Sequence, residues 1–289
     1  MKNRFLYLFL LTFLLVNFTA YAANEADNVN KINKAERIIA LSPHSVEMLF
    51  AMGAGDKIIA TTEYADYPEA AKKIERIGGY QGILIERVLE LNPDLIIVWQ
   101  SGNKSEQSAQ LKKLGFNLYF SNPTTLNSIA NELVDLGELV GHQGQAAQLA
   151  EQFTQHLANV TKQFADKTPV KTFYQLWPAP LQTAAGNSWI QNMIKICQGD
   201  NIFNDAVNDY PKVSLENVVL RSPEVFIIPI ANYQQVPDDI NWQKWPELPA
   251  VKNDQLYYLN ADLLHRASPR VLDGLDELCE SIDKARAFQ

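Results

Sequence analysis

The sequence predicts an α/β protein in which one long helix joins two related lobes. Short apolar runs alternate with helix-length periodic segments through most of the chain, a pattern typical of Rossmann-like lobes with parallel sheets. One segment of the N-terminal half recurs in the C-terminal half, and a helical apolar stripe lies between the two copies. We therefore place an N-terminal lobe at 37–141, a connecting helix at 142–167 and a C-terminal lobe at 168–289.

The segment 1–22 does not belong to these lobes. Two basic residues precede an apolar run from Phe5 to Val16, and a small-residue cleavage site ends at Ala22. About twelve apolar residues are too few to cross roughly 30 Å of hydrocarbon as a helix. We expect a signal peptide at 1–22, no membrane insertion, and an exported protein for which a bacterial periplasm fits best. The polar, aperiodic segment 23–36 predicts a flexible leader.

The predicted strands are short apolar runs, at 38–41, 58–61, 95–99, 118–120, 172–176, 225–230 and 256–259. Ser-Pro pairs at 42–43 and 268–269 offer a capping hydroxyl and a proline, which favours helix starts at both places. The connecting helix is indicated by six apolar residues at helical spacing: Ala146, Leu149, Phe153, Leu157, Val160 and Phe164. A helix over 144–165 would extend roughly 33 Å, long enough to join two lobes.

The internal repeat matches Ile83–Ile97 with Val213–Ile227. It aligns Glu86 with Glu216, and Tyr80 just upstream with Tyr210. The period is too long for a solenoid, so it favours two related lobes. Chance similarity of two helix-proline-strand units is the alternative.

Charge and cysteine content exclude some functions. With 25 basic and 33 acidic residues the formal charge is -8, which disfavours non-specific binding to nucleic acid. In an exported protein the two cysteines, Cys197 and Cys279, predict a disulfide between them, and two separately buried thiols are the alternative. Two cysteines without a local histidine cannot form a structural zinc site.

Motifs of nucleotide enzymes, dinucleotide enzymes, zinc proteases and serine hydrolases are missing from the sequence. His142 and His156 lie around the connecting helix, where we interpret them as solvated. His44 and His265 follow the first and last strands and could face one cleft. A metal site there would need a further ligand from Glu63, Asp66 or Asp262, and an ordinary polar residue in a first helical turn is the alternative for His44. Asp262 and His265 could form a base and its orienter, but no nucleophile accompanies them, so we predict no enzyme.

Aromatic residues cluster at the ends of predicted strands, namely Tyr64, Tyr67, Tyr80, Trp99, Trp177 and Tyr210. Ligands of doubly wound sheets bind outside the carboxyl ends of the strands, so these side chains could stack on a large flat ring. Each of them alone could equally be a core residue. Trp189, Trp242 and Trp245 have no comparable placement.

Several segments together resemble one known family: Tyr64–Pro68, Tyr80–Gly82 with Glu86, Trp99–Asn103, Tyr210–Ser214 with Glu216, and Arg266–Arg270. They are similar to the vitamin B12-binding periplasmic proteins of ABC importers. The resemblance runs from about Arg37 to the C-terminal helix and includes both cysteines.

The resemblance implies a monomer that holds cobalamin between two rigid lobes, without a catalytic cofactor, and delivers it to the membrane subunits of an ABC importer. The implied ligand-binding residues are Tyr64, Tyr80, Trp99, Tyr210, Asp262, Leu263, Leu264, His265 and Arg266. Tyr80 and Tyr210 stand where the family pattern has tryptophan, and Leu263–His265 replaces a more aromatic and acidic stretch, which leaves the preferred corrinoid open.

The resemblance further implies that Glu86 and Glu216 dock onto the importer, one in each lobe. Two helix-start carboxylates without a partner are the alternative. Haem or a ferric siderophore is the alternative ligand.

Overall fold

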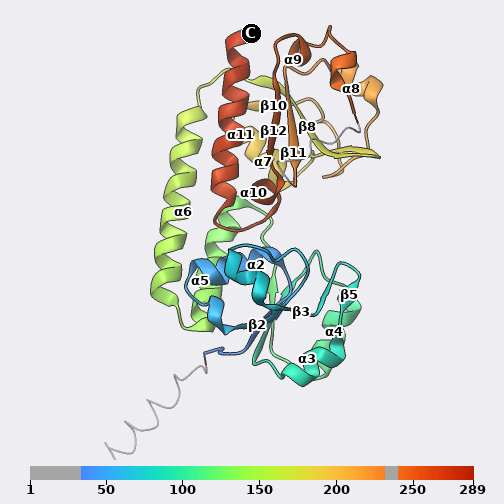
Figure 1. The fold of residues 1–289 in the computed structure, drawn as a ribbon. Helices are drawn as coiled ribbons and strands as arrows, with labels where there is room; N and C mark the ends of the chain where they lie inside the picture. The colour runs from blue at the N-terminus through green and yellow to red at the C-terminus, as the bar shows by residue number, and fades with distance from the viewer. Residues whose placement is uncertain (1–33, 232–239) are drawn as a thin grey trace, which may run out of the picture.

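The computed structural model describes residues 34–231 and 240–289, and it has the predicted α/β class. Two lobes, each built on a parallel sheet, lie toward opposite ends of one long helix (Figure 1). The predicted signal peptide and most of the predicted leader lie outside the described residues. The last leader residues, 34–36, pack on the N-terminal lobe, because Ala35 is buried and its N–H donates to the Leu139 carbonyl at 2.9 Å.

The N-terminal lobe contains a five-stranded parallel sheet in the order β3-β2-β1-β6-β7. Its strands are β1 (Ile38–Ala40), β2 (Ile58–Thr61), β3 (Glu75–Arg76), β6 (Leu95–Trp99) and β7 (Leu118–Ser121). A short antiparallel hairpin, β4 (Gly78–Gly79) and β5 (Gly82–Ile83), follows β3. The central strand β1 is buried at every position, as expected for a parallel sheet covered on both faces. All four apolar runs predicted for this lobe form strands.

Helices α2 (Pro43–Ala51), α3 (Ile85–Leu91), α4 (Ser105–Lys113) and α5 (Leu126–Val140) complete the lobe, with 3-10 turns η1 (Gly55–Lys57) and η2 (Glu69–Lys73). Ser42 caps α2 as predicted, because its hydroxyl accepts from the Ser45 N–H at 3.3 Å. α2 therefore starts directly after β1, at the carboxyl edge of the sheet.

The predicted connecting helix is present as α6 (Gln143–Phe164). It starts beside α5 in the N-terminal lobe and runs along the molecule to the C-terminal lobe, where it lies next to α11 (Val271–Ala285) (Figure 1). Its buried face carries Ala146, Phe153, Leu157, Val160 and Phe164, five of the six residues of the predicted apolar stripe. A methyl group at Gly137 of α5 would lie 2.2 Å from the Ala146 methyl, so α5 and α6 are in close contact.

The C-terminal lobe contains a parallel sheet in the order β10-β8-β11-β12, and β9 pairs antiparallel with the end of β8. The strands are β8 (Val170–Pro178), β9 (Leu181–Thr183), β10 (Gly199–Asn201), β11 (Val225–Ile230) and β12 (Leu256–Asn260). The helices, besides α11, are α7 (Trp189–Ile196), α8 (Leu215–Arg221), α9 (Pro249–Lys252) and α10 (Ala261–His265), with 3-10 turns η3 (Trp242–Lys244) and η4 (Arg286–Phe288).

One predicted helix start is wrong. Ser268 does not cap α11, which begins at Val271 after Arg270. The Ser268 hydroxyl donates instead to the carboxylate of Glu47 in the other lobe. A hydrogen bond to an ionised acceptor is stronger than one between neutral groups, which favours this contact between the lobes as the place of the Ser268 side chain.

The predicted repeat corresponds to equivalent structure in the two lobes. α3 and β6 match α8 and β11 at the offset that the repeat gives. Each of these helices ends in a left-handed residue before a proline, Asn92 with φ 44° and Ser222 with φ 50°. Asp94 then accepts from the Arg37 N–H at 3.0 Å and Glu224 accepts from the Lys171 N–H at 2.8 Å, so each acid fixes the start of the neighbouring strand. Chance similarity does not produce the same contacts twice.

The predicted disulfide between Cys197 and Cys279 is formed. Cys197 ends α7 and Cys279 lies on the buried face of α11. The bridge ties α11 to the end of α7 from within the core.

Candidate functional site

The candidate site is a cleft of about 550 Å³ between the lobes. The N-terminal lobe supplies residues that follow β1, β6 and β7, and the C-terminal lobe supplies the start of α7, the segment around Tyr210 and the end of α10. These are mainly the carboxyl ends of parallel strands, where ligands of α/β sheets bind. A ligand in this cleft would contact both lobes at once.

Trp99 forms part of the N-terminal wall, at the end of β6. The turn after it is held by Asn103, whose side chain accepts from the Trp99 N–H at 2.7 Å and donates to the Leu41 carbonyl at 3.0 Å. The indole packs over Gly102, where a methyl group would lie 2.0 Å from the ring. The ring is 37% exposed and is therefore fixed from behind while one part remains open.

Tyr210 and Asp209 form part of the opposite wall. The Asp209 carboxylate accepts from the Asn187 N–H at 2.8 Å, just before the start of α7. Gly186 has φ 56°, and a methyl group there would lie 2.6 Å from the same carboxylate oxygen. The Tyr210 ring is 45% exposed, and partial burial together with the Asp209 charge raises the pKa of its phenol. A neutral aromatic face is thus held at this wall.

His44, in the first turn of α2, lies at the edge of the cleft beside Trp99, with ring centroids 5.4 Å apart. Its Nε2 is 2.7 Å from the Ser121 hydroxyl, which itself donates to the Glu132 carboxylate of α5. Burial lowers the pKa of the imidazole to about 4 and raises the pKa of the Glu132 carboxyl to about 7. The His44 ring is therefore neutral near pH 7.

His265, at the end of α10, lies on the C-terminal wall. Its Nε2 is 2.8 Å from the hydroxyl of Tyr174, a completely buried residue of β8. The imidazole keeps an exposed edge, but burial of the rest of the ring lowers its pKa. Both histidines of the cleft are thus neutral imidazoles.

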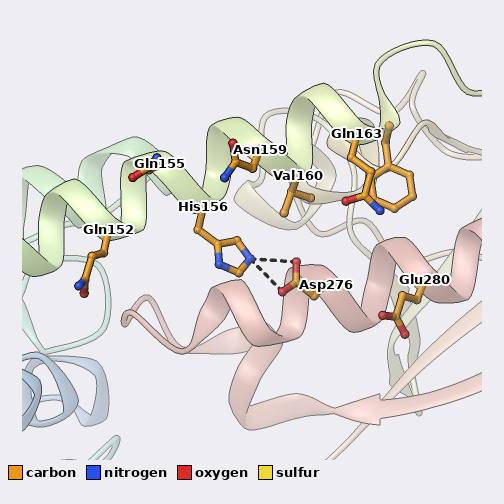
Figure 2. Close-up of a pocket in the computed structure, with 9 residues that line it drawn as sticks. Gln152, Gln155, His156, Asn159, Val160, Gln163, Asp276 and Glu280 are labelled. Atoms are coloured by element: carbon orange, nitrogen blue, oxygen red, sulfur yellow. Dashed lines mark hydrogen bonds and ion pairs between the residues drawn. The ribbon is translucent and has the colours of Figure 1, made fainter.

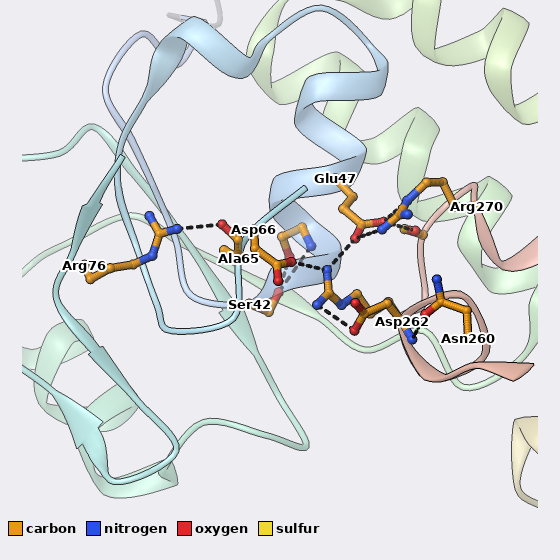
Figure 3. A network of polar contacts seen from close by, with 11 residues as sticks. Ser42, Glu47, Ala65, Asp66, Arg76, Asn260, Asp262 and Arg270 are labelled. Atoms are coloured by element: carbon orange, nitrogen blue, oxygen red, sulfur yellow. Dashed lines mark hydrogen bonds and ion pairs between the residues drawn. The ribbon is translucent and has the colours of Figure 1, made fainter. Parts of the chain in front are cut away.

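An ionic network joins the lobes beside the cleft (Figure 3). Glu47 of α2 is 4% exposed and lies 3.0 Å from Arg266 and 2.6 Å from Arg270. Arg266 also lies 2.7 Å from Asp66 and 2.8 Å from Asp262. The network places carboxylates of the N-terminal lobe against guanidinium groups of the C-terminal lobe.

The network also determines the charge of the cleft. Arg266 is the only arginine or lysine among the described residues that line it, and three carboxylates surround this guanidinium. Asp209 adds a negative charge to the wall. Described residues therefore offer no unpaired cation to a ligand.

The structure brings four of the residues predicted to bind ligand into the cleft: Trp99, Tyr210, His265 and Arg266. Tyr64 and Tyr80 are 70% and 75% exposed and do not line the cavity itself. Asp262 stands behind the wall, paired with Arg266. That Tyr64, Tyr80 and Asp262 contact a ligand stays a prediction.

Leu263 and Leu264 differ from the prediction. They are buried, at 9% and 0% exposure, and do not line the cleft. α10 is a short helix, so its apolar pair turns into the core while His265 turns toward the cleft.

Sequence reasoning left Trp189 without a role, although it lines the cleft as the first residue of α7. Ser188 caps this helix, since its hydroxyl accepts from the Gln191 N–H at 3.2 Å. A capping serine followed by an aromatic residue, soon after a strand, was the signal that could have placed Trp189 at the sheet edge.

Glu86 and Glu216 occupy equivalent places in the first turns of α3 and α8, and both are exposed. Hydrogen bonds from its own backbone N–H and from Ser214 lower the pKa of the Glu216 carboxyl. Each lobe therefore presents one helix-start carboxylate to solvent.

A second hollow, of about 500 Å³, lies away from the cleft between α6 and α11 (Figure 2). There His156 Nε2 lies 2.9 Å from Asp276, so this histidine is half-exposed but has a partner in α11. This pair links the two helices across the hollow.

No group of three or more His, Cys, Asp or Glu residues in the described part of the chain could hold a metal ion, so the ligand set imagined for His44 and His265 does not assemble. No helix within 34–231 or 240–289 is long and apolar enough to cross a membrane.

Comparison with known proteins now identifies the family. The profile of the family described as periplasmic binding protein matches residues 38–263, well over half of the chain. The chain belongs to the periplasmic binding protein family. The match covers most of both lobes of this periplasmic binding protein, together with α6.

Relatives of this periplasmic binding protein extend over the same region. The vitamin B12-binding protein of Vibrio cholerae serotype O1 is 40% identical over 246 residues, which cover 85% of this chain and 88% of the relative. The vitamin B12-binding protein of Yersinia pestis is 39% identical over 248 residues, covering 86% of each.

Solved structures agree on the fold. The crystal structure of the periplasmic vitamin B12-binding protein BtuF of Vibrio cholerae matches with a TM-score of 0.80 at 39% identity, covering 87% of this chain and 98% of that one. The periplasmic heme-binding protein RhuT from Roseiflexus matches with a TM-score of 0.76 at 22% identity, covering 88% and 100%. At that identity the second likeness shows the fold alone.

Proposed function

We propose that this protein is a periplasmic substrate-binding protein that captures cobalamin or a related corrinoid and delivers it to an inner-membrane ABC importer. The observation that carries the proposal is the cleft itself, whose aromatic walls from both lobes carry no unpaired cation among the described lining residues. Relatives of about 40% identity that are named vitamin B12-binding proteins support it.

The chemistry of cobalamin suits these walls. A corrin is a large flat ring that can stack on Trp99 and Tyr210, and each such contact is worth about 1–3 kcal/mol on comparable π-faced ligands. Its rim carries neutral carboxamide groups, which can bond to the uncharged histidines and to the amides and hydroxyls of the walls. The ligand therefore needs no counter-charge from the protein.

The alternative ligands, haem and ferric siderophores, fit the same walls less well. The propionates of haem and the anionic groups of most ferric siderophores call for a basic partner. In this cleft the lining arginine, Arg266, is already paired with Glu47, Asp66 and Asp262. Placing further carboxylates near Asp209 would add like-charge repulsion.

Calorimetry with Trp99→Ala tests the ligand and its position. We expect the wild type to bind cyanocobalamin with one-to-one stoichiometry and the variant to bind it about 10- to 100-fold more weakly, because one stacking face is lost. Phe288→Ala, which removes an exposed aromatic residue of η4 at the far end of the C-terminal lobe, is the matched control and should bind like wild type. Haem and ferric siderophores, titrated in the same way, should bind weakly or not at all.

Three results would reject the assignment. An unchanged affinity in Trp99→Ala would place the ligand elsewhere, and preferential binding of haem would replace the ligand class. Turnover of esters or phosphoesters by the wild type would move the protein from the binding class to the enzymes.

We assign the delivery step to Glu86 and Glu216. Their equivalent positions on the two lobes suit a partner with twofold symmetry, and exposed carboxylates can form charge-assisted pairs with guanidinium groups. The double variant Glu86→Ala with Glu216→Ala should keep cobalamin binding, because neither residue lines the cleft, and should lose most transport in reconstituted membranes.

Glu106→Ala with Glu247→Ala is the control for charge alone, since it also removes one exposed carboxylate from each lobe. Normal uptake by the Glu86 and Glu216 double variant would refute the docking role. Location in the periplasm is tested by mass spectrometry of the exported protein, which should begin at Ala23.

A further inference from the structure

One nitrogen of the His44 imidazole forms hydrogen bonds within the described protein, and the other does not. Among the described residues, its ring forms hydrogen bonds only through Nε2, at 2.7 Å to Ser121 and 3.3 Å to Ser42. Every buried side-chain nitrogen or oxygen in the described chain has a hydrogen-bond partner, so Nδ1 is not buried. Since His44 borders the cleft, Nδ1 is the ring atom that a ligand can reach.

The residues behind His44 determine whether Nδ1 donates or accepts. An ionised Glu132 can only accept, so the Ser121 hydroxyl must donate its proton to that carboxylate. The Ser121 oxygen can then only accept from His44, which requires the proton to be on Nε2. Nδ1 therefore carries a lone pair. This relay of Glu132, Ser121 and His44 fixes the tautomer, as a hydrogen-bonded carboxylate does behind a metal-binding histidine.

His265 on the opposite wall is held in the other tautomer. Tyr174 is completely buried, and His265 Nε2 is its hydroxyl's hydrogen-bond partner among the described residues. Its O–H must therefore donate to Nε2, because a buried donor without an acceptor would cost about 1–3 kcal/mol. The proton of His265 is then on Nδ1, which gives the C-terminal wall a donor.

We infer that His44 is a specificity-determining residue of the cleft, whose Nδ1 accepts a hydrogen bond from a carboxamide N–H of the ligand and disfavours a carboxylate in the same place. A carboxylate would set its own lone pairs against that of Nδ1, with no proton between them. His265 complements this contact, because its Nδ1–H can donate to an amide carbonyl. The inference rests on the proposed function, since it names which chemical groups of a corrinoid the cleft distinguishes.

The first test measures the tautomers directly. Nitrogen chemical shifts of the full mature chain near pH 8 should show a pyridine-type Nδ1 for His44 and a pyridine-type Nε2 for His265. His44→Gln and His265→Gln assign the signals, because the chain has only four histidines. A protonated Nδ1 at His44 would overturn the inference before any ligand is added.

The second test uses four probes: cyanocobalamin and its three monocarboxylic acids, in each of which one propionamide is hydrolysed. At pH 8.5 the wild type should bind at least one acid tenfold or more weakly than cyanocobalamin. Ser121→Ala cuts the relay at a residue that is 0% exposed, so it cannot touch the ligand. In that variant the ratio of the affinity for cyanocobalamin to the affinity for the acid should fall to threefold or less, because His44 is then free to present a proton at Nδ1.

Ser108→Ala is the matched control, since it also removes a buried hydroxyl from the N-terminal lobe but one that bonds only to the Lys104 carbonyl. It should keep the wild-type ratio. Two results overturn the inference while the proposed function stands. One is a wild type whose affinity for all three acids equals its affinity for cyanocobalamin. The other is an affinity ratio between cyanocobalamin and the acids that stays at the wild-type value in Ser121→Ala. Failure of the wild type to bind cyanocobalamin at all rejects the proposed function instead.

A pH series adds a readout that a purely structural role would not change. Glu132 is faced by Ser121, Tyr119 and the Asn122 N–H from β7 and its end, by Asp135 on its own helix, and by His44 through Ser121. Glu132 titrates near pH 7 while the ligand carboxylate stays ionised. The affinity ratio between cyanocobalamin and the acid should therefore decrease as the pH is lowered from 8.5 to 5.5. A ratio independent of pH in the wild type would count against the relay.

Discussion

At the scale of single residues, the site depends on small groups behind the side chains that face the cleft. Trp99 has its place because Gly102 leaves room for the indole and Asn103 fixes the turn beneath it. His44 has its tautomer because Ser121 and Glu132 lie behind it. Gly102, Ser121 and Glu132 do not line the cleft, yet they determine how Trp99 and His44 meet a ligand.

Gly102→Ala should therefore impair binding without removing a contact. The new methyl group would lie 2.0 Å from the Trp99 ring, so the indole must move. We expect cyanocobalamin affinity to fall about tenfold and stability to fall by about 1–3 kcal/mol, the usual cost of overpacking. Calorimetry and urea unfolding measure the two effects. Gly144→Ala, at a position of α6 with open space around it, should leave affinity unchanged and should not lower stability, because alanine is the better helix former. Equal behaviour of the two variants would contradict the explanation.

Glu132→Gln should change how stability depends on pH. The folded-state pKa of Glu132, about 7, is above its ordinary value of 4.5, so the wild type loses stability as the pH rises between these values. The loss is at most about 3 kcal/mol. His44 acts in the opposite direction, because its pKa is lowered from 6.5 to about 4 and stability rises with pH over that range. His265, whose pKa is also lowered to about 4, acts in the same direction as His44.

In the glutamine variant the contribution of Glu132 to the pH dependence of stability is absent, and the contribution of the histidines remains. Urea unfolding at pH 4.5 and pH 8 should then show that the variant gains stability relative to wild type as the pH rises. If the unfolding free energies of the wild type and the variant changed in parallel with pH, Glu132 would not be titrating in the folded protein.

Sequence could place residues near the cleft where a local pattern marks them, while their contact with a ligand stays a prediction. Trp99 and Tyr210 end or adjoin strands in recognisable segments, and both lie at the cleft. The role of Ser121 could not be predicted, because a serine at the end of a strand has no feature that points to a histidine 77 residues away. The leucine pair of α10 was predictable in principle, since adjacent apolar residues in a short helix turn toward the core.

At the scale of elements, apolar pattern and repeat were sufficient for most of the fold. The seven predicted strands and the connecting helix are present, and each carries an apolar run or stripe that the fold buries at least in part. Strands β3, β4, β5, β9 and β10 were not predicted. They are very short, and they pair because the larger sheet places a partner beside them rather than because of their own sequence.

The disulfide is the element-scale feature with the largest expected effect on stability. It joins α7 to α11 across a sequence separation of 82, which stabilises the folded chain by about 4 kcal/mol in the chain-entropy model. Urea unfolding with a reductant present should show a lower midpoint than without it. The Cys197→Ala with Cys279→Ala variant should unfold at one midpoint in both conditions. A wild-type midpoint that does not respond after complete reduction would contradict this estimate.

At the scale of the whole molecule, the arrangement of the lobes could not be predicted from the sequence. Glu47 and its partner Arg266 are 219 residues apart, and no local pattern links them. Sequence predicts that each lobe forms, because each has its own apolar core. How the lobes face one another depends on side chains that meet only after both have folded.

Glu47→Ala should show how much this contact contributes. The substitution leaves Arg266 and Arg270 without their buried carboxylate, and breaking such a buried pair costs about 3–5 kcal/mol. We expect a lower urea midpoint and a larger spread of inter-lobe distances in solution scattering. Glu75→Ala, which breaks the half-exposed pair with Arg87, should lower the urea midpoint far less and leave the scattering unchanged. Equal costs in the two variants would show that the inter-lobe network is not a special contact.

The inter-lobe network also has a kinetic consequence. Because the ion pairs of Glu47 with Arg266 and Arg270 are the protein's own contacts between the two walls, little of the binding energy is spent on bringing the walls together. Ligand entry is then limited by diffusion and orientation, and differences in affinity between corrinoids become differences in residence time. A ligand held in this way leaves slowly by itself, so rapid handover requires a partner that pulls the lobes apart. The strength of the inter-lobe network then determines how much work that partner must do.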